Sequence, residues 1–304
     1  MSRVEEARRR AIGRTVDDDR AYPSATFANG EADPAELEDY PRERRQAERV
    51  PQVTPVTSSR SIAAPRAASS GHLGALDPEL DGKLVGGPNT PPIVIEQYRR
   101  LAATLHELQV DTGLKTMMVT SSMPREGKTL TVTNLALTLS TSYRRRVLLI
   151  DADLRRPTLH EVFRLPKTVG LSEALRSGSR PHLLELSPLL SILPAGELEG
   201  DPLSALTSDR FKTLIEHCTA AFDWVLLDAP PVGLMPDGNV LARVVKAVVF
   251  VIAAGVTPHR TVERAISEIG RDNIVGTVLN RIEEQQLPAG NEYTDYYSPI
   301  RSSQ

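Results

Sequence analysis

Residues 117–129 read Met-Met-Val-Thr-Ser-Ser-Met-Pro-Arg-Glu-Gly-Lys-Thr, an apolar run that breaks into a short polar loop ending in Gly-Lys-Thr. A loop of this composition between a strand and a helix is typical of phosphate binding. The backbone N–H groups around Gly127 can surround a polyphosphate, Lys128 can reach its outer phosphates, and the Thr129 hydroxyl can bind Mg²⁺. The stretch therefore predicts a nucleotide site.

The loop departs from the usual phosphate-loop spacing at one position. That spacing places a glycine five residues before the glycine of Gly-Lys-Thr, and the residue there is Ser122. A Gly-Lys-Thr sequence alone is also compatible with an ordinary helix start. The interpretation therefore depends on the rest of the chain.

Two further apolar runs end in aspartate. Residues 146–150 are followed by Asp151 and Asp153, and residues 223–227 are followed by Asp228. Ligands of open α/β sheets bind beyond the carboxyl ends of the strands, so these carboxylates are expected at the same edge as the loop. They can hold Mg²⁺ or accept a proton from an attacking hydroxyl. Arg155 and Arg156 would balance their charge.

Apolar runs alternate with amphipathic segments along the rest of the chain, with about seven strand candidates in all. Strands are expected at 115–120, 146–150, 189–194, 223–227, 247–254 and 273–279, and helices at 93–110, 130–140, 157–164, 170–175, 209–221 and 259–269. This alternation predicts an α/β fold with a doubly wound, largely parallel sheet and helices on both faces. Asn280 ends the last strand and could hydrogen-bond a nucleotide base.

Composition divides the chain into three parts. Residues 1–90 are rich in Pro, Ala, Ser, Arg and acidic residues and are expected to form a disordered linker region. Residues 91–285 form the expected domain. Residues 286–304 are expected to be a flexible tail, and they contain Tyr293, Tyr296 and Tyr297, three of the seven tyrosines in the chain.

Several classes of function and location are disfavoured. The longest apolar run, 247–256, is about half of a membrane span, and the N-terminus is charged rather than signal-like, which predicts a cytoplasmic chain. The lone Cys218 cannot form an intramolecular disulfide and is read as a small helix residue. The six histidines lack zinc-site spacing, and a pI near 6.1 without a basic block argues against nucleic-acid binding.

Together these residues resemble the bacterial tyrosine autokinases (BY-kinases) of capsule and exopolysaccharide export, in their soluble form. The likeness rests on Thr-Ser-x-x-Pro-x-Glu-Gly-Lys-Thr at 120–129, Asp-x-Asp-x-Arg at 151–155, Leu-Leu-Asp-Ala-Pro-Pro at 226–231 and the tyrosine cluster. The family loop also lacks the early glycine. The resemblance implies a P-loop NTPase fold and a kinase that phosphorylates its own tail.

The resemblance also implies roles for individual residues. ATP would be bound by Ser122, Pro124, Arg125, Glu126, Gly127, Lys128, Thr129, Leu130 and, at the adenine, Asn280. Mg²⁺ would be bound by Thr129, Asp151 and Asp228, the catalytic residues would be Lys128, Asp151 and Asp153, and the phosphate acceptors would be Tyr293, Tyr296 and Tyr297. A tyrosine hydroxyl has a pKa of about 10, so a carboxylate at Asp151 or Asp153 should take its proton.

Partners are implied in the same way. Family members form homo-oligomeric rings, and soluble members are activated by a membrane-anchored polysaccharide co-polymerase that lends a contact to the nucleotide site. The chain would then be recruited to the inner face of the membrane, where it would regulate polymerisation and export of the polysaccharide.

Two departures from the family pattern keep alternatives open. Arg125 stands where the family loop usually has glycine or serine, which denies the backbone easy positive φ and places a guanidinium near the phosphates. Ala102 replaces the second arginine of the Glu-x-x-Arg-x-x-Arg oligomerisation helix, after Glu96 and Arg99. One alternative is an ATP-binding regulator without kinase activity. Another is a MinD/ParA-like ATPase switch, although that group has a lysine where this loop has Met123.

Overall fold

The computed structural model describes residues 76–166, 169–245 and 247–282 of the chain. The expected phosphate acceptors Tyr293, Tyr296 and Tyr297 lie outside the described residues. Among the helices that are described, none combines the length and apolar character needed to cross a membrane.

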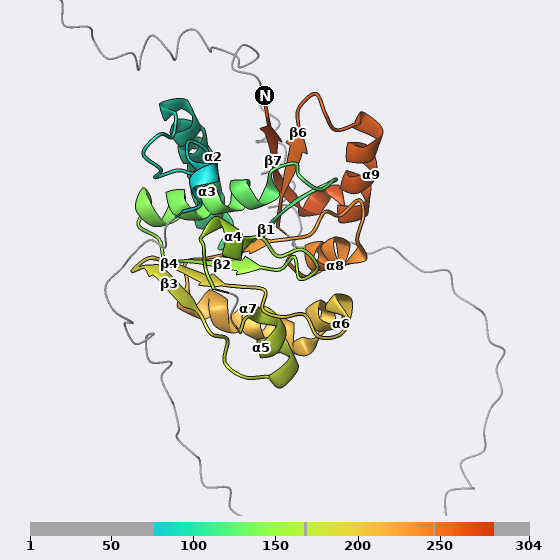
Figure 1. The fold of residues 1–304 in the computed structure, drawn as a ribbon. Helices are drawn as coiled ribbons and strands as arrows, with labels where there is room; N and C mark the ends of the chain where they lie inside the picture. Colours follow the sequence, from blue (N-terminus) through green and yellow to red (C-terminus); the bar gives the residue numbers. More distant parts are fainter. Residues whose placement is uncertain (1–75, 167–168, 246, 283–304) are drawn as a thin grey trace, which may run out of the picture. The chain divides into compact units, whose positions relative to one another are not determined.

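A seven-stranded sheet organises the described part of the chain (Figure 1). Its strands, in spatial order, are β3 (Leu184–Ser187), β4 (Leu190–Leu193), β2 (Val147–Asp151), β5 (Trp224–Asp228), β1 (Thr116–Ser121), β6 (Val248–Ala253) and β7 (Ile274–Asn280). All neighbours are parallel except β3 and β4, which are antiparallel. The predicted largely parallel sheet is therefore confirmed.

Helices cover both faces of the sheet because the side chains of a strand alternate between its two faces. One face packs against η1 (Pro78–Leu80), α2 (Pro92–Thr112), α3 (Lys128–Thr141) and α4 (Leu159–Val162). The other packs against α5 (Leu171–Ser177), α6 (Pro202–Thr207), α7 (Asp209–Ala221), α8 (Pro236–Val245) and α9 (His259–Ile269), and η2 (Arg271–Asn273) precedes β7. In β1, Met117 and Val119 face the first set of helices and Met118 faces the second.

Apart from the short η1 and η2, three elements of the described part of the chain lie outside the expected strands and helices. Strand β3 is a short edge strand that forms a hairpin with β4, and its sequence Leu-Glu-Leu-Ser has no apolar run. Helix α8 begins Pro-Asp-Gly, a sequence typical of turns. Helix α6 carries a start signal that could have revealed it, since Asp201 precedes Pro202 and its side chain accepts a hydrogen bond from the Ser204 N–H.

Residues 76–90, which the sequence assigns to the linker region, pack against the domain. Leu84 is 1% exposed and belongs to the apolar core between the sheet and α3. The Val85 N–H donates to Oδ1 of Asn134 at 2.7 Å, and Asn134 Nδ2 donates to the Lys83 carbonyl at 2.8 Å. This segment looked like a solvated linker because a few apolar residues are scattered among Gly, Pro and Asp.

Cys218 lies on a helix, α7, as the sequence predicts, and its side chain is buried. Burial raises the pKa of its thiol to about 11. Such a thiol is almost entirely protonated at neutral pH, so it acts as a small core residue rather than a nucleophile.

Candidate functional site

The loop after β1 turns at Gly127, immediately before α3. Gly127 has a φ of 97°, a left-handed conformation that costs glycine little. A Cβ atom added there would lie 2.1 Å from Nδ2 of Asn280. Glycine is therefore required for two reasons, and it places Lys128 and Thr129 at the N-terminal end of α3, where N–H groups and the helix dipole favour anions.

The Glu126 carboxylate accepts hydrogen bonds from other residues of this loop. Glu126 is buried, and it accepts hydrogen bonds from Oγ of Ser122 at 3.1 Å and from the Met123 N–H at 2.7 Å. The Thr257 hydroxyl, from the loop after β6, also donates to it. A loop that begins with Ser122 instead of glycine therefore keeps a defined turn, since hydrogen bonds hold its two ends together.

Arg125 adopts the conformation that its side chain disfavours. Its φ is 66°, which costs a non-glycine residue about 1–2 kcal/mol. As the sequence predicts, arginine denies the loop an easy positive φ, but the loop adopts one at this cost. The reason is that neighbouring groups hold the peptide: the Arg125 carbonyl accepts a hydrogen bond from Nη2 of Arg281 at 2.5 Å. The Arg125 side chain itself is exposed.

Asn280 reaches the site from the end of β7. Its Nδ2 donates to the Glu126 carbonyl at 2.9 Å, so this amide binds the loop backbone. Contact between Asn280 and a nucleotide base stays a prediction.

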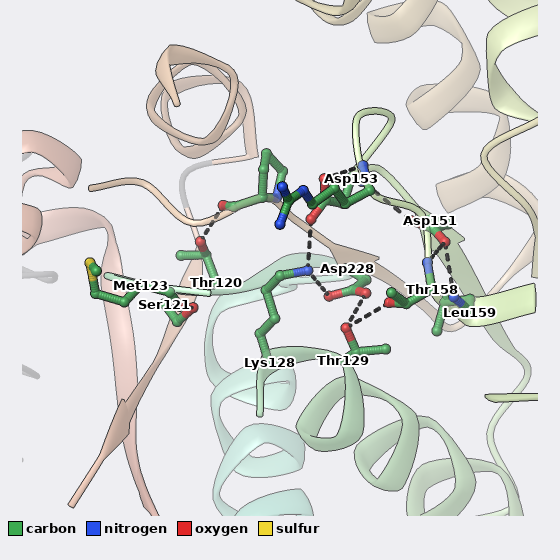
Figure 2. A network of polar contacts seen from close by, with 12 residues as sticks. Thr120, Ser121, Met123, Lys128, Thr129, Asp151, Asp153, Thr158, Leu159 and Asp228 are labelled. Atoms are coloured by element: carbon green, nitrogen blue, oxygen red, sulfur yellow. Dashed lines mark hydrogen bonds and ion pairs between the residues drawn. The ribbon is translucent and has the colours of Figure 1, made fainter. Parts of the chain in front are cut away.

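Lys128 and two aspartates meet at the start of α3. Figure 2 shows the Lys128 side chain reaching between Asp153 and Asp228. Its Nζ lies 3.0 Å from Oδ2 of Asp153 and 3.3 Å from Oδ1 of Asp228. Burial lowers the pKa of Lys128, but the charges of Asp228 and Asp153 outweigh it and raise that pKa above 10.5. The lysine is therefore charged, and it is the cation of a buried cluster.

Asp151 is a strongly perturbed member of this cluster. It lies opposite Asp228 on the neighbouring strand, and its Oδ2 accepts the N–H groups of Thr158 and Leu159, each at 3.0 Å. Burial, followed by the charge of Asp228, raises the pKa of Asp151 to about 8. Burial also raises the pKa of Asp228. The expectation that these strand ends meet at one edge of the sheet is confirmed by the register.

The donor set around Thr129 fits a magnesium ion that completes its coordination with nucleotide phosphates. Oγ1 of Thr129 donates to Oδ2 of Asp228 at 2.7 Å and lies 3.1 Å from Oγ1 of Thr158. Within the described residues, no three His, Cys, Asp or Glu side chains form a complete metal site. Mg²⁺ usually needs only one or two carboxylates besides phosphates and water. Three carboxyl groups lie close to one ammonium, and in their ionised form they carry an excess of negative charge that a divalent cation would balance.

The sequence reading missed Asp237, which holds the second motif in place. Asp237 lies in the first turn of α8 and is 1% exposed. Nε of Arg155 donates to one of its carboxylate oxygens at 2.6 Å and Nη2 donates to the other at 3.3 Å. The ion pairs of Arg155 are therefore with Asp237 and, at 4.0 Å, with Asp201, and a Pro-Asp-Gly sequence gave no sign of this.

The other residues that the sequence predicts to bind the nucleotide differ in their solvent exposure. Pro124 is exposed on the loop, whereas Ser122 is fully buried. The Leu130 side chain packs against the apolar core beside α2, so only the backbone of that residue can serve a nucleotide. Close packing also requires glycine at position 233, because a Cβ atom on Gly233 would lie 2.5 Å from the Ser122 carbonyl oxygen.

Comparisons with known proteins agree with this geometry. The chain is 34% identical to the tyrosine-protein kinase YwqD of Bacillus subtilis over 206 residues, which cover 66% of this chain and 85% of YwqD. The structure resembles that of the chimerical protein CapA2B2, with a TM-score of 0.61 and 26% identity over 66% of this chain and 90% of the chimera. It also resembles the kinase domain of the Escherichia coli tyrosine kinase ETK, with a TM-score of 0.58 and 28% identity over 62% of this chain and 78% of that domain. No family model matches the sequence.

Proposed function

Because the chain belongs to the family of bacterial tyrosine-protein kinases, we propose that it transfers the γ-phosphoryl group of MgATP to tyrosine hydroxyl groups. Its acceptors are Tyr293, Tyr296 and Tyr297 of its own C-terminal segment. Three tyrosines within five residues of a polar segment support this assignment, since the flanking residues offer no apolar face that would bury them.

The observation that carries the proposal is the position of Lys128 between Asp153 and Asp228 at the N-terminal end of α3. Phosphoryl transfer depends on positioning and on charge stabilisation more than on covalent chemistry. Lys128 can turn its ammonium from the carboxylates to the phosphates of a nucleotide in the loop. That movement would release Asp153 and Asp228 from their ion pairs.

A base is needed because a tyrosine hydroxyl with a pKa of about 10 is a poor nucleophile at neutral pH. We infer that Asp151 or Asp153 takes this role. The raised pKa of Asp151, about 8, makes its ionised form a stronger proton acceptor than an ordinary aspartate. Mg²⁺, when bound by Thr129 and Asp228, supplies positive charge beside the phosphates.

We also propose that this kinase regulates exopolysaccharide or capsule polymerisation and export. A membrane-anchored polysaccharide co-polymerase would activate it and recruit it from the cytoplasm to the inner face of the membrane. The support is the motif resemblance, together with the likeness to CapA2B2. Oligomerisation through α2 is less well supported, because Ala102 is fully buried and its position cannot contribute a surface arginine.

The proposal is tested by incubating the purified full chain with MgATP and probing for phosphotyrosine. Lys128→Met should reduce phosphotyrosine by about a hundredfold or more, because charge stabilisation of the transferring phosphoryl group is lost. Changing Tyr293, Tyr296 and Tyr297 together to Phe should abolish phosphorylation of the tail while ATP binding remains. His217→Met, a substitution on α7, is the matched control and should leave phosphotyrosine unchanged.

The same assay separates the rival functions. ATP hydrolysis by the wild-type chain without phosphotyrosine would contradict the kinase and favour a MinD/ParA-like switch. ATP binding without hydrolysis or transfer, both alone and with the proposed membrane activator present, would favour an ATP-binding regulator.

A further inference from the structure

Two residues at the end of β7 hydrogen-bond to consecutive carbonyl groups of the nucleotide loop. Asn280 Nδ2 donates to the Glu126 carbonyl at 2.9 Å, and Arg281 Nη2 donates to the Arg125 carbonyl at 2.5 Å. The partners are 154 and 156 residues apart in the sequence. Both contacts come from the edge strand of the sheet, next to β6.

The geometry of the peptide group gives these contacts a consequence for ligand binding. In a planar trans peptide, the C=O of one residue and the N–H of the next point in opposite directions. A carbonyl of Arg125 held toward Arg281 therefore directs the Glu126 N–H the other way. The Glu126 carbonyl, held toward Asn280, does the same for the Gly127 N–H. Consecutive N–H groups that point away from such a support form an anion-binding concavity.

Backbone strain is concentrated at the same contact. Arg125 has a φ of 66° and Arg281 a φ of 61°, and these are two of the four non-glycine residues with positive φ in the described part of the chain. Strained residues persist where their surroundings hold them, and they gather at functional sites. Neither Ser122 nor Arg125 gives the loop the freedom of a glycine, so an external support has to impose its shape.

We propose that Asn280 and Arg281 are positioning residues that set the loop for the phosphate chain of the nucleotide. This inference rests on the proposed function, which assigns the loop to the ATP phosphates. It also gives Asn280 a different role from a base contact: the residue acts on the phosphates through the Glu126 peptide, and its effect is independent of the base.

The test compares ligands that share phosphates but differ in the base. Binding of MgATP, MgGTP and magnesium tripolyphosphate to the full chain is measured by calorimetry for the wild type, Asn280→Ala and Arg281→Ala. Asn273→Ala and Arg271→Ala are matched controls, because the same residue types stand there in η2, before the amino end of β7. Asn280→Ala and Arg281→Ala should each lower the affinity for all three ligands by about tenfold, the loss expected for one hydrogen bond. Neither control should change any of them.

Each other outcome overturns the inference. A weaker affinity for MgATP with unchanged tripolyphosphate binding would assign Asn280 to the base. Unchanged binding of every ligand would show that the loop needs no support from β7. Failure of the wild-type chain to bind tripolyphosphate would show that the loop is not a phosphate-binding site. Failure of the proposed function gives a different result, since a chain that binds all three ligands but makes no phosphotyrosine leaves this inference intact.

Discussion

At the residue scale, the site depends on buried carboxylates that outnumber their cation. Asp151, Asp153 and Asp228 surround Lys128, and each of the four side chains is buried. Charges brought this close in a poorly solvated place are costly unless a counterion or a proton balances them. Asp151 shows the consequence directly, because its pKa rises to about 8.

We predict that the free energy of unfolding falls as pH rises from about 4 to about 8 when metal and nucleotide are absent. The pKa of Asp151 is raised from 3.8 to about 8 in the folded chain. Between these values the folded state holds a proton that the unfolded state has released, so a rise in pH favours unfolding. Urea denaturation in a chelator across this range measures the effect.

Asp151→Asn is the informative comparison for this prediction. Asparagine cannot ionise, so the variant should lose stability less steeply as pH rises. Burial raises the pKa of Asp228 too, so the variant should keep part of the pH dependence and differ from the wild type in slope. Equal slopes for the two proteins would show that Asp151 ionises normally.

At the element scale, α3 connects the site to the rest of the domain. Its first residue, Lys128, reaches the carboxylates, and its middle holds the segment before α2 through Asn134. Asn134 is 1% exposed, and both ends of its amide are used. The helix therefore holds both the site and an early segment of the chain.

We predict that Asn134→Ala lowers the free energy of unfolding by about 1–3 kcal/mol, because the buried Val85 N–H loses its acceptor. Urea denaturation measures this loss, and hydrogen exchange should show faster exchange around Val85. Thr138→Ala is a suitable control, since the Thr138 hydroxyl bonds only within α3, to the Asn134 carbonyl. Similar exchange rates around Val85 in both variants would contradict the role given to Asn134.

At the scale of the whole molecule, the strand order brings the three motifs together. β1, which leads into the phosphate loop, lies beside β5, and β5 lies beside β2. The register sets Asp228 opposite both Val119 and Asp151. Motifs separated by many residues thus end at one edge of the sheet.

We predict that residues 76–282 contain everything needed to fold and to bind MgATP. A fragment of residues 91–304 should be less stable than one of 76–304, because it loses the buried side chains of Leu84 and Val85. Full burial of such a side chain is worth about 1.5–3 kcal/mol. Urea denaturation of the two fragments compares them, and equal stability would place the domain boundary at residue 91. A fragment of residues 76–282 should bind MgATP. Because it lacks the C-terminal tail, it should form no phosphotyrosine there.

The elements that the sequence predicted well are those with a strong local pattern. The apolar runs that became β2, β5 and β6 are buried on both faces and need no partner to be recognised. β3 was missed because it has only four residues, too few to show a clear alternation, and α8 was missed because its first residues, Pro-Asp-Gly, indicate a turn. Long-range packing overrode the local preference at the start of α8.

The sequence by itself determined the chemistry available to this protein: a phosphate loop, aspartates at two strand ends and an α/β alternation that brings them to one edge. These features are local, since residue type and periodicity within a short window encode them. Only the tertiary structure decided how the loop keeps its shape. Glu126 bonds to Thr257, and the loop carbonyls bond to Asn280 and Arg281. Such contacts join residues more than a hundred positions apart, and they exist only once the sheet has brought β7 and the loop after β6 beside the loop.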